Sequence, residues 1–140
     1  MNAKAFFDTN VLIYVVAQDA VRTAPAEALL AAGGLISVQI LNEMASVARR
    51  KLGMSWKEVT EVLAAVRTLC PSPAPLTIET HEDALRIAAQ YGYRIYDALV
   101  AATALENDCS TLYTEDLQDG QVIDGRLTIR NPFEASSTQR

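Results

Sequence analysis

The sequence predicts an α/β domain, with a central, mainly parallel sheet of about four to five short strands flanked by helices. Short apolar runs of strand length alternate with longer segments that have helical periodicity. Half of the 140 residues are hydrophobic and 21% are charged, which is the balance of an ordinary globular protein. We therefore expect one domain over residues 1–133, followed by a loose tail at residues 134–140.

Turn and cap signals set the bounds of the elements along the chain. Gly33-Gly34 ends one helix, Ser55 and Glu58 form a capping box, and Thr80 with Asp83 is expected to cap another helix. The proline-rich segment 71–75 predicts a rigid connector. The expected strands are 4–7, 35–37, 76–78, 111–113 and 126–130, and the expected helices are 11–17, 25–32, 38–52, 55–69, 80–92 and 96–107.

Composition excludes several classes of protein. The net charge is −5, with 17 acidic and 12 basic residues, which argues against a protein that coats nucleic acid through a broad basic face. Cys70 and Cys109 form no CxxC pair, so buried, reduced thiols and a cytoplasmic location are expected. The N-terminus has no signal-peptide pattern, and the apolar run 11–17 is too short to span a bilayer, so no membrane anchoring is expected.

Two aspartates follow expected strands, where an open parallel sheet binds ligands beyond the carboxyl ends of its strands, and a third begins a helix beside that edge. Asp8 follows the first expected strand, and Asp116 follows the strand 111–113. Asp97 begins a helix that is apolar on nearly every face and is expected to pack into the core. Each position also suits an ordinary turn or helix cap, so both interpretations stand at this point.

Glu43 is less expected, because it lies inside the helix 38–52 beside apolar residues at three- and four-residue spacing, Ile40 and Val47. Alone it suits a solvated glutamate at the margin of the apolar stripe. If it meets the three aspartates, the carboxylates repel one another by about 4 kcal/mol per pair at 4 Å. An all-oxygen site favours Mg²⁺ or Mn²⁺ as the ion that relieves this repulsion, and the single His81 provides no histidine-rich site.

With their surroundings, these acids resemble the PIN-domain family, and specifically the VapC-type toxins of bacterial toxin–antitoxin pairs. The similarity runs from Phe6 to Phe133. Five short motifs carry it in order: Phe7-Asp8-Thr9-Asn10-Val11-Leu12-Ile13-Tyr14, Leu41-Asn42-Glu43, Tyr96-Asp97-Ala98-Leu99-Val100-Ala101-Ala102-Thr103-Ala104, Leu112-Tyr113-Thr114-Glu115-Asp116 and Asn131-Pro132-Phe133.

The resemblance implies that Asp8, Glu43, Asp97 and Asp116 form the family's acidic quartet, with the three aspartates as ligands of Mg²⁺ or Mn²⁺. It also implies hydrolysis of RNA phosphodiester bonds, with Thr114 and Asn10 orienting the acids. The last acid varies in position within this family. Asp116 keeps the usual spacing from the threonine, and Asp119 is the alternative.

The same resemblance implies an RNA substrate, a cognate antitoxin protein and a homodimer. Phosphate contacts are expected from the triplet 49–51 or from Arg94, although basic residues also suit a helix C-terminus. Tyr91, Tyr93 and Tyr96 suit either base stacking or core packing. The alternatives to a ribonuclease are a catalytically silent binding module of the same fold, and a metal-dependent phosphatase or DNA nuclease.

Overall fold

Residues 4–133 are described in this computed structural model, and they form six helices and one four-stranded sheet. The elements are β1 (Ala5–Phe7), α1 (Thr9–Ala17), α2 (Thr23–Ala32), α3 (Val38–Arg50), α4 (Trp56–Leu69), α5 (Ile78–Tyr91), α6 (Ile95–Glu106), β2 (Thr111–Tyr113), β3 (Val122–Ile123) and β4 (Leu127–Arg130). The α/β class is confirmed. The expected tail at 134–140 lies outside the described residues.

The sheet has the order β1-β2-β4-β3, in which β1, β2 and β4 are parallel and β3 runs antiparallel to β4. The prediction of a mainly parallel sheet is confirmed. Phe7 pairs with Tyr113, and Tyr113 pairs with Arg130, so the three parallel strands end at the same edge. Whatever follows β1 and β2 in the sequence is therefore brought side by side at that edge.

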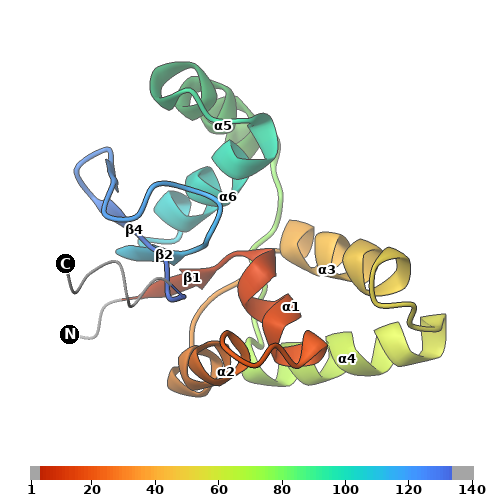
Figure 1. The fold of residues 1–140 in the computed structure, drawn as a ribbon. Coiled ribbons are helices and arrows are strands. Elements are labelled where there is room, and N and C mark those ends of the chain that lie inside the picture. Colours follow the sequence, from red (N-terminus) through yellow and green to blue (C-terminus); the bar gives the residue numbers. More distant parts are fainter. Residues whose placement is uncertain (1–3, 134–140) are drawn as a thin grey trace.

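Two groups of helices lie on opposite sides of the sheet, α5 and α6 on one side and α1 to α4 on the other (Figure 1). Helix α6 contacts β2, β4 and α5, and its residues Ala98 to Leu105 are all buried. The prediction of a core helix after Asp97 is thus confirmed. Within residues 4–133, no helix is long and apolar enough to cross a membrane.

The strand expected at 76–78 is wrong, because this segment begins a helix. The Thr77 side chain accepts a hydrogen bond from the backbone N–H of Thr80, and α5 starts at Ile78. The N-cap of α5 is therefore Thr77, and the expected cap of Thr80 with Asp83 is wrong. The apolar residues that suggested a strand are exposed, Leu76 at 46% and Ile78 at 68%, so they give no evidence of a core-facing strand.

The strand expected at 35–37 is reduced to two isolated parallel bridges, from Leu35 to Phe6 and from Ser37 to Ala74. It ends at once because Ser37 caps α3, its side chain accepting a hydrogen bond from the backbone N–H of Ile40. A two-residue strand, β3, was not expected, since two residues carry no detectable periodicity.

A close approach at Gly34 holds the segment before α3 against β1. A Cβ atom at Gly34 would lie 2.5 Å from two ring atoms of Phe7, whose side chain is fully buried. We expect Gly34→Ala to lower the free energy of unfolding by about 1–3 kcal/mol, because the buried ring must shift within the core to relieve the overlap. Chemical denaturation measures this change.

The matched test is Phe7→Leu, which shortens the side chain that an alanine at Gly34 would strike. We expect the double variant to be less destabilised than the sum of the two single variants, since the shorter side chain relieves the overlap. Additive effects would contradict this explanation of the glycine.

Candidate metal and catalytic site

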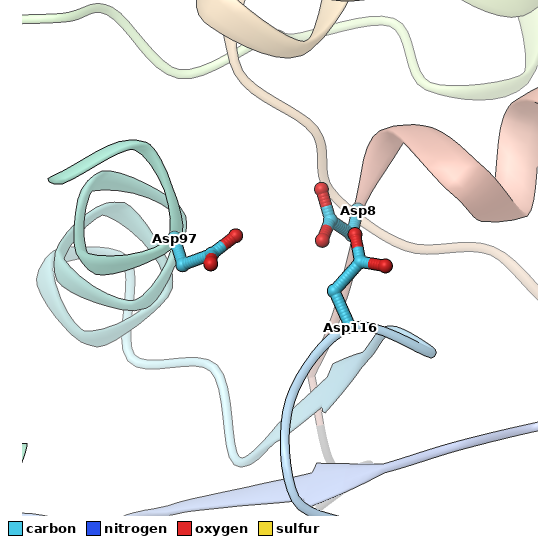
Figure 2. Close-up of side chains that lie close together, drawn as sticks. All are labelled: Asp8, Asp97 and Asp116. Carbon is cyan, nitrogen blue, oxygen red and sulfur yellow. The ribbon is translucent and has the colours of Figure 1, made fainter. Parts of the chain in front are cut away.

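Three aspartates from distant parts of the chain converge at the carboxyl edge of the sheet. Asp8 follows β1, Asp116 lies in the turn after β2, and Asp97 lies in the first turn of α6. One carboxylate oxygen from each lies within 4.8 Å of those of the other two. Figure 2 shows Asp97 pointing from its helix toward the other two carboxylates.

Asp8 is the buried member of this group, with only 6% of its surface exposed. It caps α1, and its two carboxylate oxygens accept hydrogen bonds from the backbone N–H of Thr9 at 2.7 Å and from the hydroxyl of Thr114 at 2.8 Å. Burial outweighs the two hydrogen bonds and, together with the charges of Asp116 and Glu43, raises the pKa of Asp8 to about 6. Asp8 therefore both caps α1 and belongs to the group of three aspartates.

Thr114 connects Asp8 to Asp116. Its hydroxyl donates to Asp8 and accepts a hydrogen bond from the backbone N–H of Asp116 at 3.0 Å. The Asn10 side-chain amide donates to a carboxylate oxygen of Asp116 at 3.2 Å. Thr114 and Asn10 thus make the orienting contacts that the sequence suggested.

The two candidates for the fourth acid are separated by the structure. Asp116 is exposed and belongs to the three-aspartate group. The carboxylate of Asp119 accepts a hydrogen bond from the backbone N–H of Asn131 at 2.8 Å, so it fastens the turn to the chain after β4.

Asp97 is the third residue of α6, where the unpaired backbone N–H groups of a helix favour negative charge. The cap residue is Arg94, which makes no side-chain cap, so Asp97 is not the N-cap. Its carboxylate instead accepts a hydrogen bond from Arg94 at 3.3 Å.

Glu43 lies in the same cleft but outside the tight group of three aspartates. The hydroxyl of Thr9 donates a hydrogen bond to its carboxylate at 2.9 Å, which fixes Glu43 beside the group. Sequence reasoning missed Thr9, and the signal was its position directly after Asp8 at the start of α1.

The four acids line a cleft of about 290 Å³ together with two arginines, Arg50 and Arg94. Of the basic triplet, Arg50 lines the cleft, whereas Arg49 lies over the ring of Trp56 at 5.0 Å. Ser46, one turn after Glu43 on α3, also lines the cleft and was not expected.

The tyrosines divide into two kinds. The hydroxyl of Tyr91 is hydrogen-bonded to Asp124, and that of Tyr93 donates to Gln121, so both pack within the fold. Tyr96 is 60% exposed and lines the cleft.

The residues present suit a hard divalent cation. All the ligand atoms of the group are carboxylate oxygens, which Mg²⁺ and Mn²⁺ prefer. Without a cation, each pair of ionised carboxylates at this separation repels by roughly 3–4 kcal/mol at an effective dielectric of about 20. Asp8, Asp97 and Asp116 are therefore the residues that would hold the ion.

The fold and this site define a PIN domain: the PIN-domain model of protein families matches residues 5–118, and the chain belongs to that family. No curated protein matches the sequence.

Solved structures with the same fold include toxins. A toxin–antitoxin complex from Klebsiella pneumoniae has a TM-score of 0.71 and 21% identity, with 93% of this chain and 98% of that one covered. Mycobacterium tuberculosis VapC20, described as a sarcin–ricin loop cleaving toxin, has a TM-score of 0.62 and 20% identity, with 81% and 92% covered. VapBC2 from Rickettsia felis, bound to a promoter DNA fragment, has a TM-score of 0.65 and 18% identity, with 91% and 97% covered.

The raised pKa of Asp8 predicts the pH dependence of stability in the metal-free protein. The pKa of Asp8 is about 6 in the folded state and 3.8 as its ordinary value, so the protein loses stability as pH rises from about 4 to about 6, and the loss is complete above that pH. We expect Asp8→Asn, measured in EDTA by chemical denaturation at pH 8, to raise the free energy of unfolding by roughly 2–3 kcal/mol. This gain should shrink as pH falls below 6 and vanish below about pH 3, where the wild-type carboxyl is protonated in both states.

Asp19→Asn is the matched control. Asp19 is half-buried, with 30% of its side chain exposed, and it accepts hydrogen bonds from the backbone N–H groups of Arg22 and Val21, which lower its pKa. We expect no gain from this variant. A gain at Asp19 equal to that at Asp8, or no gain at Asp8, would contradict the account of buried charge.

Proposed function

We propose that this PIN domain is a metal-dependent endoribonuclease and the toxin of a VapC-type toxin–antitoxin pair. The observation that carries the proposal is the convergence of Asp8, Asp97 and Asp116 within 4.8 Å beside a cleft that also contains Glu43. Family membership supports it, as does the likeness in fold to toxins, one of which is described as cleaving the sarcin–ricin loop.

In this proposal the four acids have two roles. Asp8, Asp97 and Asp116 would hold Mg²⁺ or Mn²⁺, and the ion would supply neutralisation of phosphate charge and a lowered pKa for an attacking water. Glu43 accepts a proton from that water, because its carboxylate faces the same cleft and is fixed by Thr9. Arg50 and Arg94 bind phosphate oxygens of the RNA from the cleft wall.

The proposed partners are an antitoxin protein and a second copy of the chain. Two of the structures with this fold are described as a toxin–antitoxin complex and as VapBC2, which supports the antitoxin. The homodimer stays a prediction of the family resemblance. We also propose a cytoplasmic location, since Cys70 and Cys109 are free, buried thiols.

The test is cleavage of labelled tRNA and rRNA by antitoxin-free protein in Mg²⁺, Mn²⁺ or EDTA. We expect cutting only with metal, and a loss of at least about 100-fold in rate for Asp8→Asn and Asp97→Asn. The matched control is Asp108→Asn, which removes the same charge at the opposite end of α6, where Asp108 is highly exposed. Cutting that persists in the first two variants would indicate a contaminant, and no cutting with any metal would favour a silent binding module.

Asp116 and Asp119 are tested against each other. We expect Asp116→Asn to lose cleavage in the way that Asp8→Asn does, and Asp119→Asn to stay within about twofold of wild type. An asparagine at position 119 can still accept the hydrogen bond from the Asn131 N–H, so the turn is preserved. The opposite result in a cleavage assay would make Asp119 the fourth acid.

A further inference from the structure

We propose that Glu115 is a positioning residue, which fastens the turn after β2 to α1 and thereby fixes the place of Asp116. By the Glu115 cluster we mean Glu115, Tyr14 and Arg22, none of which lines the cleft of the acids. The inference rests on the proposed function, because it concerns the ion that Asp116 would hold. It goes beyond that function by assigning a role to side chains outside the cleft.

The turn that carries Asp116 has little support from its own backbone. Among residues 4–133, no hydrogen bond between two backbone groups involves Glu115, Asp116 or Leu117. Asp116 is also exposed, so packing does not confine its side chain. The turn is held by side-chain contacts instead, which are the Thr114 hydroxyl, the packing of Leu117 against the core, and the contacts of Glu115.

Both carboxylate oxygens of Glu115 have partners. The Oε1 atom accepts a hydrogen bond from the hydroxyl of Tyr14, and the Oε2 atom lies 3.4 Å from the buried Nε atom of Arg22. The guanidinium carbon of Arg22 lies 5.2 Å from the centre of the Tyr14 ring. Each side chain of the cluster therefore contacts the other two, and Glu115 is held from two sides.

The partners of Glu115 are themselves fixed. The ring of Tyr14 packs edge-on against Phe133 with 5.0 Å between ring centres, and its backbone carbonyl accepts a hydrogen bond from the Thr23 hydroxyl at 2.6 Å. The backbone N–H of Arg22 donates to the carboxylate of Asp19 at 2.8 Å. The Glu115 cluster is thus anchored to α1, to the start of α2 and to the chain after β4.

Helix α1 holds both acids of the turn from successive helical turns. Asn10 and Tyr14 are four residues apart and so lie on one face of α1. The Asn10 amide donates to Asp116, and the Tyr14 hydroxyl donates to Glu115. Asp8 is the N-cap of this same helix, and Figure 2 shows Asp116 directed from its turn toward Asp8. One rigid helix therefore sets the spacing between two of the three aspartates.

The experiment measures the affinity of the antitoxin-free chain for Mn²⁺, from the electron paramagnetic resonance signal of the free ion. We expect Glu115→Ala to weaken binding by about 10-fold or more, as loss of an outer contact of a metal site does. Tyr14→Phe removes no charge and should weaken it by about 3-fold or more. The two changes together should bind as weakly as Glu115→Ala alone, because the hydroxyl then has no partner.

Tyr91→Phe is the matched control for loss of stability. Asp124 accepts hydrogen bonds from Tyr91 and from Arg86, so the same three kinds of side chain meet again at α5, on the opposite side of the sheet from α1 (Figure 1). We expect Tyr91→Phe to lower the midpoint of urea denaturation much as Tyr14→Phe does. Its affinity for Mn²⁺ should stay within about twofold of wild type.

Asp119→Asn is the matched control for charge. It removes one negative charge from the same turn and can still accept its hydrogen bond. We expect its affinity for Mn²⁺ to stay within about threefold of wild type, well short of the change in Glu115→Ala.

Cleavage of RNA separates positioning from direct catalysis. In Glu115→Ala we expect the Mn²⁺ concentration at half-maximal rate to rise by about 10-fold or more. The rate at saturating Mn²⁺ should stay within about threefold of wild type, because all four acids of the cleft are still present.

Unchanged affinity for Mn²⁺ in both Glu115→Ala and Tyr14→Phe, or an equal loss in Tyr91→Phe, would overturn the role of Glu115 and leave the proposed nuclease standing. A wild-type chain that binds no Mn²⁺ would overturn that role together with the metal site. Affinity that depends on the Glu115 cluster, in a chain that cuts no RNA with any metal, would support the role and remove the nuclease.

Discussion

The parallel pairing of β1 with β2 sets Phe7 opposite Tyr113, and the residue after each strand enters the site. Asp8 and Thr114 are therefore neighbours because of backbone register, before any side-chain contact forms. The hydrogen bond between them follows from that register, and Thr114 in turn receives the backbone N–H of Asp116. A slip of one residue in this pair would turn these side chains to the other face of the sheet. The close packing of Gly34 on Phe7 holds the adjoining segment against this strand.

The site is kept at a cost in stability. Asp8 receives two hydrogen bonds that favour its charged form, yet burial and the charge of its neighbours raise its pKa to about 6. The carboxylates are thus destabilised when ionised without a cation, and the surrounding fold holds them in place. Helix α6 is suited to this task, since it is buried from Ala98 to Leu105 and directs Asp97 at the group from its first turn. A rigid, apolar helix fixes a charged side chain more accurately than a loop does.

The features of the fold and the site that the sequence predicted are those that depend on residues close together in the sequence. The position of Asp97 before an apolar helix and of Asp8 after a strand are local patterns, and both were placed correctly in their elements. The segment 76–78 was misassigned because exposed leucine and isoleucine give the same local pattern as a buried strand. The bond from Thr9 to Glu43 joins residues 34 positions apart, so periodicity within either segment carries no information about it. The different contacts of Asp116 and Asp119 in the turn after β2 likewise depend on a distant partner, because Asp119 accepts a hydrogen bond from the backbone N–H of Asn131.

The charged groups of the cleft explain how a protein with a net charge of −5 can be suited to bind RNA under the proposed function. The cleft contains four carboxylates and two guanidinium groups, so without a cation it repels phosphate. Under the proposed function, a divalent ion held by the aspartates would cancel that excess, so that Arg50 and Arg94 could attract the RNA backbone. Metal binding and RNA binding would then be coupled, because both take place in the same cleft. The net charge of −5 argues only against RNA binding elsewhere on the surface.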